Sequence, residues 1–223
     1  MKDVTVIIPT LNEEKNISKI IKLIKSLYKN INILVVDDGS TDNTQKIVKT
    51  TDAILLDRSQ KKTKGLTISI IDGIMQTKSK YIIVIDADLQ HPPEKIGEIV
   101  AKLKKGSDIV VASRKTIKKW HILRKIISKT AVIFGRIRLK FNGINVSDPV
   151  SGFFGINRGY AKANIQSSEK KYEKQGYKIL FDILKYSKNP KITEVHYDFQ
   201  ARDHGNSKIG PRHIFAYLRS LFK

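Results

Sequence analysis

Short apolar runs alternate with amphipathic stretches along the first half of the chain. The apolar runs are rich in β-branched residues, and they lie at 4–8, 33–36, 53–56, 81–85 and 108–112. Runs of this length and composition predict strands buried on both faces of a sheet. The stretches between them repeat apolar residues at helical spacing. The alternation of strand and helix therefore predicts an α/β fold with a mostly parallel, doubly wound sheet.

The second half of the chain has a different pattern. It predicts a strand at 192–199 and amphipathic helices at 117–139, 172–186 and 212–222. The first and last of these helices are strongly basic, and such helices can lie in a membrane interface, where apolar burial and attraction to anionic headgroups add. The alternative is that both pack on the domain's own sheet with their lysines in water.

Composition limits the classes of protein to which the chain can belong. The chain has 223 residues, which suits one domain spanning 1–223, and its formal net charge is +21. Such a charge attracts nucleic acid, anionic lipid or phosphorylated substrates. The chain has no cysteine, which excludes disulfides and thiolate metal sites. No apolar run is long enough to span a bilayer, so we expect no transmembrane segment within the chain.

Acidic residues follow two of the predicted strands directly. Asp37 and Asp38 come after the run at 33–36, and Asp86 and Asp88 come after the run at 81–85. Open α/β sheets bind ligands at the carboxyl ends of their strands. Carboxylates there can hold a divalent ion against a diphosphate, although solvated acids ending a strand are the alternative. The sequence lacks both the G-x-G-x-x-G fingerprint and the P-loop motif, so a nucleotide would be bound in another way.

The five histidines, in contrast, lack any spacing typical of metal ligands, and they are interpreted as incidental. His91 is the only one near the proposed site.

Several motifs occur in an order that resembles a known family. They are PTLNE at 9–13, DDGSTD at 37–42, DADLQHPPE at 86–94, DPVSGFF at 148–154 and RDHGNSK at 202–208. Together they resemble the inverting GT-A glycosyltransferases of family 2, and DADLQHPPE with DPVSGFF resembles the dolichol-phosphate mannose synthases within it. The resemblance spans nearly the whole chain.

This resemblance implies transfer of mannose from GDP-mannose to dolichyl or another polyprenyl phosphate. The reaction would use Mg²⁺ or Mn²⁺ and take place at the cytoplasmic face of a membrane, to which the chain binds peripherally. A membrane domain or partner subunit could complete the enzyme, and no nucleic acid would be bound.

The resemblance also implies roles for individual residues. The nucleoside pocket would be lined by Pro9, Leu11, Glu13, Val36 and Asp38. Asp86 and Ala87 would contact nucleoside or sugar, and the metal ligands would be Asp88 and Gln90, with Asp86 beside them. The acceptor phosphate would be held by Arg114, Arg124 and Ser128, and the donor phosphates by Arg202 and Lys208. Catalysis would depend most on Asp88, Arg114 and Arg202.

The residues also support this transfer reaction on chemical grounds, independently of the resemblance. Departure of a nucleoside diphosphate builds negative charge, which a divalent ion and basic side chains can stabilise. A phosphate monoester is largely anionic at neutral pH, because its second pKa is about 6. The acceptor therefore needs cations to position it and no general base.

Three alternatives remain open at this stage. The first is the same fold with UDP-glucose as donor. Leu11 bears on the choice between guanine and uracil, because many relatives have an aromatic residue at this position near the base. The second is a basic nucleic-acid-binding protein, which would leave Asp38, Asp86 and Asp88 unexplained because acids repel phosphate. The third is a nucleotide-sugar pyrophosphorylase, which would have a glycine-rich loop where this chain has PTLNE.

Overall fold

The computed structural model describes residues 1–117, 122–174, 176–200 and 210–222. The strands are β1 (Val4–Thr10), β2 (Asn32–Asp37), β3 (Ile54–Asp57), β4 (Tyr81–Val84), β5 (Ile109–Ile117), β6 (Phe154–Asn157) and β7 (Ile192–Phe199). The α-helices are α1 (Ile17–Leu27), α2 (Thr44–Lys49), α3 (Leu66–Gln76), α4 (Ile96–Lys104), α5 (Ile122–Lys140), α6 (Arg158–Ser168), α7 (Ile179–Lys185) and α8 (Pro211–Phe222). Short 3₁₀ helices lie at Pro93–Lys95 and Glu169–Lys171.

The strands form one seven-stranded sheet in the order β3-β2-β1-β4-β6-β5-β7. Every neighbouring pair is parallel except the two pairs made by β6, which runs antiparallel between β4 and β5. The first residue of β6, Phe154, pairs with Val84 at the carboxyl end of β4 and with Val111 on β5. The segment before β6 therefore meets the carboxyl end of β4 and an interior part of β5, which continues to Ile117.

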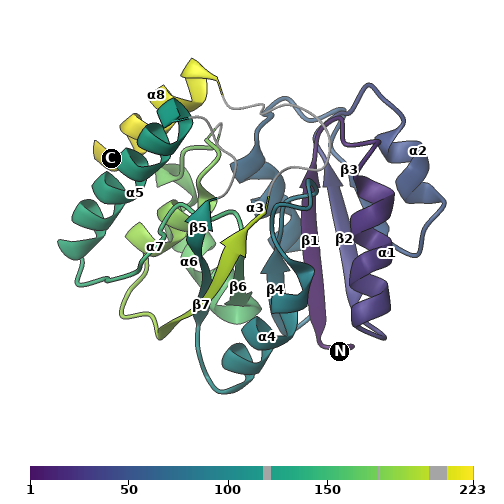
Figure 1. Cartoon of the computed structure of the whole chain (residues 1–223), viewed down its shortest axis with the longest axis horizontal. Coiled ribbons are helices and arrows are strands. Elements are labelled where there is room, and N and C mark those ends of the chain that lie inside the picture. Colours follow the sequence, from purple (N-terminus) through teal and green to yellow (C-terminus); the bar gives the residue numbers. More distant parts are fainter. Residues whose placement is uncertain (118–121, 175, 201–209, 223) are drawn as a thin grey trace.

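Helices cover both faces of this sheet (Figure 1). On one face, Ile20 and Ile24 of α1 belong to the same buried cluster as Ile99 of α4. On the other face, residues of α3, α6, α7 and α8 form a second buried cluster. This three-layer arrangement confirms the predicted α/β class and the mostly parallel sheet, and it leaves the carboxyl ends of the parallel strands open at one rim.

Two predicted helices have different bounds in the structure. The basic helix predicted at 117–139 starts later, because β5 continues to Ile117 and α5 begins at Ile122. The helix predicted at 172–186 is confined to α7, because a turn in which the Gly176 amide bonds the Glu173 carbonyl precedes it. The predicted helix at 212–222 corresponds to α8. Helix α6 was not predicted, since its buried residues are as often polar as apolar.

Helix α8 is attached to the domain by buried polar contacts. The Ser220 hydroxyl donates to Asp182 of α7 at 2.7 Å, and Lys185 donates to the Ser220 carbonyl. The Tyr217 hydroxyl donates to the Ala131 carbonyl of α5 at 2.7 Å. Because Asp182 and Lys185 are buried, breaking these contacts would leave charges in the protein interior. We refer to the contacts of Ser220 with Asp182 and Lys185 as the α8 clamp.

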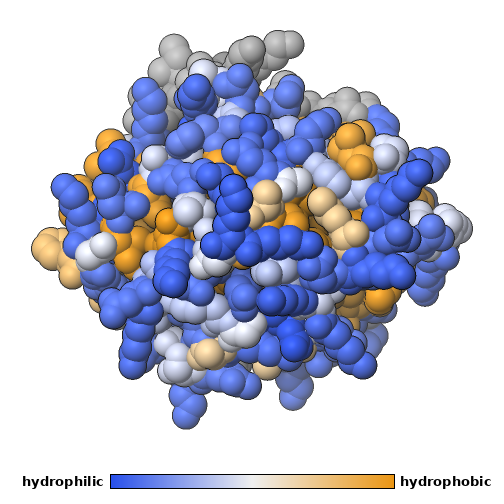
Figure 2. Space-filling model, turned by 90° about the horizontal axis from the view of Figure 1, so that it is seen from below, coloured by the Kyte–Doolittle hydropathy of each residue, from blue (hydrophilic) through white to orange (hydrophobic). Residues whose placement is uncertain are grey.

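Helices α5 and α8 nevertheless expose large apolar side chains, which we call the apolar stripe. Its members are Ile127, Ile133, Phe134, Ile137 and Phe141 at α5, and Phe215, Leu218 and Phe222 on α8. The spacing along α5 places its members on one side of the helix, and the exposed cations Lys129, Arg136 and Lys140 run alongside. Figure 2 shows hydrophobic surface at the end of the molecule where α5 lies in Figure 1. Among the described helices, none has the length and apolar character needed to cross a bilayer.

Candidate active site

A cavity of about 290 Å³ opens at the rim where the parallel strands end. Most of the predicted site residues surround it, from segments far apart in the chain. They are Pro9, Leu11, Glu13, Asp38, Asp86, Ala87, Asp88, Gln90 and Arg114. The parallel order of β2, β1 and β4 explains this convergence, since residues that follow parallel strands share one edge of the sheet.

The remaining predicted residues lie elsewhere. Val36 is fully buried in β2, and its Cγ2 would lie 3.0 Å from a Cβ added at Gly73 of α3, so its side chain belongs to the core instead of the nucleoside pocket. Ser128 lines a second cavity. Arg202 and Lys208 lie outside the described residues, and Arg124 lies on α5 without a described side chain.

The acidic loop after β4 is held in a defined shape. Leu89 adopts a left-handed backbone conformation with φ of 61°, which is uncommon for a residue with a branched side chain. The Gln90 amide donates to Asp88 Oδ1 at 3.1 Å. Gln90 Nε2 donates to the Gln200 carbonyl at 3.1 Å, and the Gln200 amide donates to the Gln90 carbonyl at 3.0 Å. The end of β7 thus fixes the side-chain amide of Gln90.

These contacts suit a divalent ion that arrives with a diphosphate. Because Gln90 Nε2 is used by Gln200, its Oε1 is the atom that remains for a cation, and Asp88 supplies a carboxylate at the same cavity. The described residues include no group of three or more acidic, histidine or cysteine side chains with metal-binding geometry. Mg²⁺ is usually bound by one or two carboxylates together with substrate phosphates. Asp88 and Gln90, with Asp86 beside them, fit such an ion.

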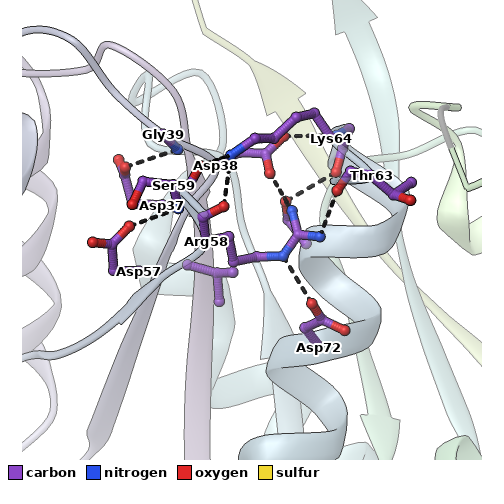
Figure 3. Close-up of polar contacts among 12 residues, drawn as sticks. Asp37, Asp38, Gly39, Asp57, Arg58, Ser59, Thr63, Lys64 and Asp72 are labelled. Carbon is purple, nitrogen blue, oxygen red and sulfur yellow. Dashed lines mark hydrogen bonds and ion pairs between the residues drawn. The ribbon is translucent and has the colours of Figure 1, made fainter. Parts of the chain in front are cut away.

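Asp38 belongs to a buried network that the sequence did not indicate. Arg58 is 1% exposed, and it donates to Asp38 and, at 2.8 Å, to Asp72 (Figure 3). It also donates to the Ser69 hydroxyl at 2.8 Å. The Gly65 amide donates to the other oxygen of Asp38 at 2.6 Å. Burial raises the pKa of Asp38, while the Gly65 amide and the charge of Arg58 oppose this shift. The network therefore fixes Asp38 and the start of α3 at the wall of the cavity.

Arg114 lies between the first cavity and the second, which has a volume of about 520 Å³. The second cavity is also lined by Lys115, Ser128 and Lys129. Arg114 Nε and Nη2 bond the carboxylate of Asp148 at 2.5 and 3.0 Å. Burial is the largest single influence on the pKa of Arg114 and acts to lower it. The charge and hydrogen bonds of Asp148, together with the charges of Tyr197 and Asp86, outweigh burial and raise the pKa, so the guanidinium stays charged.

The backbone of β5 also contributes to this placement of Arg114. The register between β5 and β7 shifts between Arg114 and Thr116. Such irregularities re-aim side chains next to active sites.

Several cavity residues were missed by the sequence reasoning. His91, Gly152, Tyr177, Lys178 and Phe199 all line the first cavity. The adjacent DADLQ and DPVSGFF motifs were a signal for His91 and Gly152. Tyr177 and Lys178 precede a short helix and had no local signal. His91 was expected to lie near the site without a role as a metal ligand, and its ring is buried in the wall of the cavity.

Comparison with known sequences identifies the class of protein to which this fold and this site belong. The sequence model of Glycosyl transferase family 2 matches residues 5–164. The chain belongs to glycosyltransferase family 2.

Within this family the chain resembles proteins with one recurring name. A dolichol-phosphate mannosyltransferase of Pyrococcus furiosus is 37% identical over 99% of this chain, which spans 63% of the length of that relative. A dolichol-phosphate mannosyltransferase of Saccharomyces cerevisiae is 28% identical over 97% of this chain and 85% of its own length.

A solved structure agrees with the fold. Glucosyl-3-phosphoglycerate synthase of Mycobacterium tuberculosis, determined with Mn²⁺, UDP and glucosyl-3-phosphoglycerate, superposes with a TM-score of 0.67. The two sequences are 21% identical, and the matched region covers 98% of this chain and 79% of the synthase chain. At this identity the likeness concerns the fold alone, and that fold is GT-A.

Proposed function

We propose that this chain transfers mannose from GDP-mannose to dolichyl or another polyprenyl phosphate, with inversion at the sugar carbon, at the cytoplasmic face of a membrane. The observation that carries the proposal is the arrangement of the two cavities around Arg114. The first has acidic ligands suited to a metal-bound diphosphate, and the second has cations suited to a phosphate acceptor. Arg114 borders both, so a donor and an acceptor bound there would meet. The names of the relatives agree with this pairing of substrates.

The reaction needs no proton transfer. An oxygen of the acceptor phosphate forms a bond to the first carbon of mannose, and the bond from that carbon to the β-phosphate oxygen breaks. The electron pair leaves with GDP. Arg114, oriented by Asp148, would hold the acceptor phosphate, since guanidinium binds phosphate bidentately. Ser128 and Arg124 would assist it, and Arg202 and Lys208 would bind the donor phosphates.

Asp88 and Gln90, with Asp86, would hold Mg²⁺ or Mn²⁺. When bound, the ion would neutralise charge on the diphosphate. Asp86 and Ala87 would contact nucleoside or sugar, and Pro9, Leu11, Glu13 and Asp38 would surround the nucleoside.

The direct test is transfer of radiolabel to lipid. The chain is incubated with labelled GDP-mannose, Mg²⁺ and polyprenyl phosphate, and we expect label in the organic phase. Labelled UDP-glucose serves as the matched donor, and thermal stabilisation by GDP is compared with that by UDP in the presence of Mn²⁺. Transfer from UDP-glucose alone would contradict the assignment of the donor and leave the class of reaction standing.

The apolar stripe provides the contact with the membrane in this proposal. Its flank of Lys129, Arg136 and Lys140 would face anionic headgroups while the apolar side chains enter the interface. Ser128 and Lys129 lie on the same helix and line the second cavity. A lipid phosphate would thus lie near the surface that binds its membrane.

Replacing Phe134 and Ile137 together by serine is expected to weaken binding to anionic vesicles by roughly tenfold or more. The change removes about 2 kcal/mol of apolar burial in the interface. Ile54→Ser is the matched control, because Ile54 is exposed on β3, away from α5. Binding is measured by sedimentation with vesicles. Equal vesicle binding by the double variant and the control would show that the apolar residues of α5 do not contact the membrane.

A further inference from the structure

His91 is a buried polar side chain in the wall of the first cavity, and neither the motif reasoning nor the comparisons give it a role. It is 2% exposed. Its Nε2 lies 3.0 Å from Asp86 Oδ2, and its Nδ1 lies 2.6 Å from the hydroxyl of Tyr197 on β7. The rings of Phe153 and Phe199 pack around it, with centroids 5.5 and 5.2 Å from its own. These contacts together fix the orientation of the imidazole ring.

The partners of His91 also determine where its hydrogen lies. An ionised carboxylate only accepts hydrogen bonds, so the contact with Asp86 requires a hydrogen on Nε2. In a neutral ring Nδ1 is then the acceptor, and the Tyr197 hydroxyl donates to it. With the ring neutral, the hydrogen bonds run in one direction, from Tyr197 through His91 to Asp86.

A second segment of the chain also approaches this carboxylate closely. A Cβ added at Gly152 would lie 2.7 Å from Asp86 Oδ2 and 3.3 Å from Oδ1. Only glycine allows this approach. The Asp86 carboxylate is therefore confined by two groups, the imidazole of His91 and the backbone of the segment before β6. It is nevertheless partly exposed, so this confinement aims it at the cavity.

We propose that His91 is a positioning residue that fixes the Asp86 carboxylate to accept hydrogen bonds from hydroxyl groups of a nucleotide sugar. This inference rests on the proposed function, because it requires a nucleotide sugar in the first cavity. A carboxylate free to rotate would lose affinity, since the ligand would then have to order it on binding. Tyr197 acts on Asp86 through His91, although it does not itself line the cavity.

Three substitutions test whether His91 positions the Asp86 carboxylate through its hydrogen bond or only fills space beside it. His91→Gln keeps an N–H donor near the position of Nε2, whereas His91→Leu fills the same region without a donor. Tyr197→Phe keeps the aromatic ring and removes the hydroxyl. His196→Leu on β7 is the matched control, because that histidine is exposed.

The measurement is the Kd for GDP-mannose with Mn²⁺ and without acceptor, by calorimetry. Loss of the partner that orients a metal-ligating side chain typically costs 10- to 100-fold in affinity or activity, and we expect an effect at the lower end of that range for a carboxylate that binds a hydroxyl group. We therefore expect His91→Leu to raise the Kd about tenfold or more, Tyr197→Phe to raise it by a smaller factor, and His91→Gln and His196→Leu to stay within about threefold of the original chain. The thermal midpoint is recorded for each variant. In a chain that already has Asp86→Ala, His91→Leu should add less than about twofold, because the two residues act as one unit.

Each result decides a separate point. Equal Kd values for the leucine and glutamine variants of His91, or a full effect of His91→Leu in the Asp86→Ala chain, would overturn the role of His91. Failure of the original chain to bind GDP-mannose while it binds UDP-glucose would contradict the proposed donor, and the comparison of variants is then made with UDP-glucose. Failure to bind any nucleotide sugar would overturn both proposals.

Discussion

Replacing Asp88 by alanine is expected to reduce the proposed transfer of mannose by about a thousand-fold. Asp88 is 6% exposed, and its carboxylate lies at the first cavity beside Gln90. Removing a group that stabilises charge on the leaving diphosphate costs about 10²- to 10³-fold in comparable sites. The fold should persist, because within the loop the substitution removes a hydrogen bond from the Gln90 amide, worth about 1 kcal/mol.

Turnover at saturating donor and acceptor, together with the thermal midpoint, tests this expectation. Asp52→Ala is the matched control, since Asp52 is an exposed acid away from the cavity. Transfer by Asp88→Ala at the rate of this control would place the metal site elsewhere. A large fall in the thermal midpoint of Asp88→Ala alone would instead indicate a structural carboxylate.

Replacing Arg58 by methionine is expected to destabilise the domain by about 3–5 kcal/mol, the usual effect of removing one partner from a buried ion pair. Methionine fills part of the space but leaves Asp38 without its cation, and that carboxylate is 9% exposed. Because Arg58 also bonds Ser69 and the Thr63 carbonyl, the start of α3 should loosen as well. Binding of GDP should weaken in parallel, since Asp38 and Ser69 line the first cavity.

Denaturant unfolding measures the free-energy change, and Lys61→Met in the same loop is the control because Lys61 is exposed. Adding Asp38→Asn to Arg58→Met should restore part of the stability, since it removes the buried charge. Unfolding of Arg58→Met at the denaturant concentration of the control would show that the network contributes little. Partial rescue by Asp38→Asn distinguishes loss of the ion pair from poor packing of methionine.

Local pattern was sufficient to predict most of the sheet and its ligand-binding rim. The runs at 33–36 and 81–85 are buried strands, and the acids after the run at 81–85 lie at the cavity because parallel strands share an edge. The direction of β6 was beyond this reasoning, since an apolar run looks the same in either orientation. The turn at Glu173–Gly176 was also missed, because the residues around it keep helical spacing.

The side-chain networks depend on contacts that no local pattern contains. Arg58 lies in a basic stretch that reads as a solvated loop, and its burial depends on Asp38 and Asp72, which the fold brings to it. His91 depends on Tyr197, which is far along the chain on the last strand. Val36 shows the opposite error, because a position beside a binding motif was assigned to the pocket and its side chain faces α3.

The α8 clamp has a consequence for how the enzyme would stand on a bilayer. Because Ser220 contacts both Asp182 and Lys185 in the interior, α8 cannot swing out as an independent anchor. The height of the cavities above the lipid plane is then a fixed property of the folded domain. In the proposed reaction, the phosphate headgroup of the lipid would have to reach the cavities at that height, while its hydrocarbon tail, of any length, would stay in the bilayer.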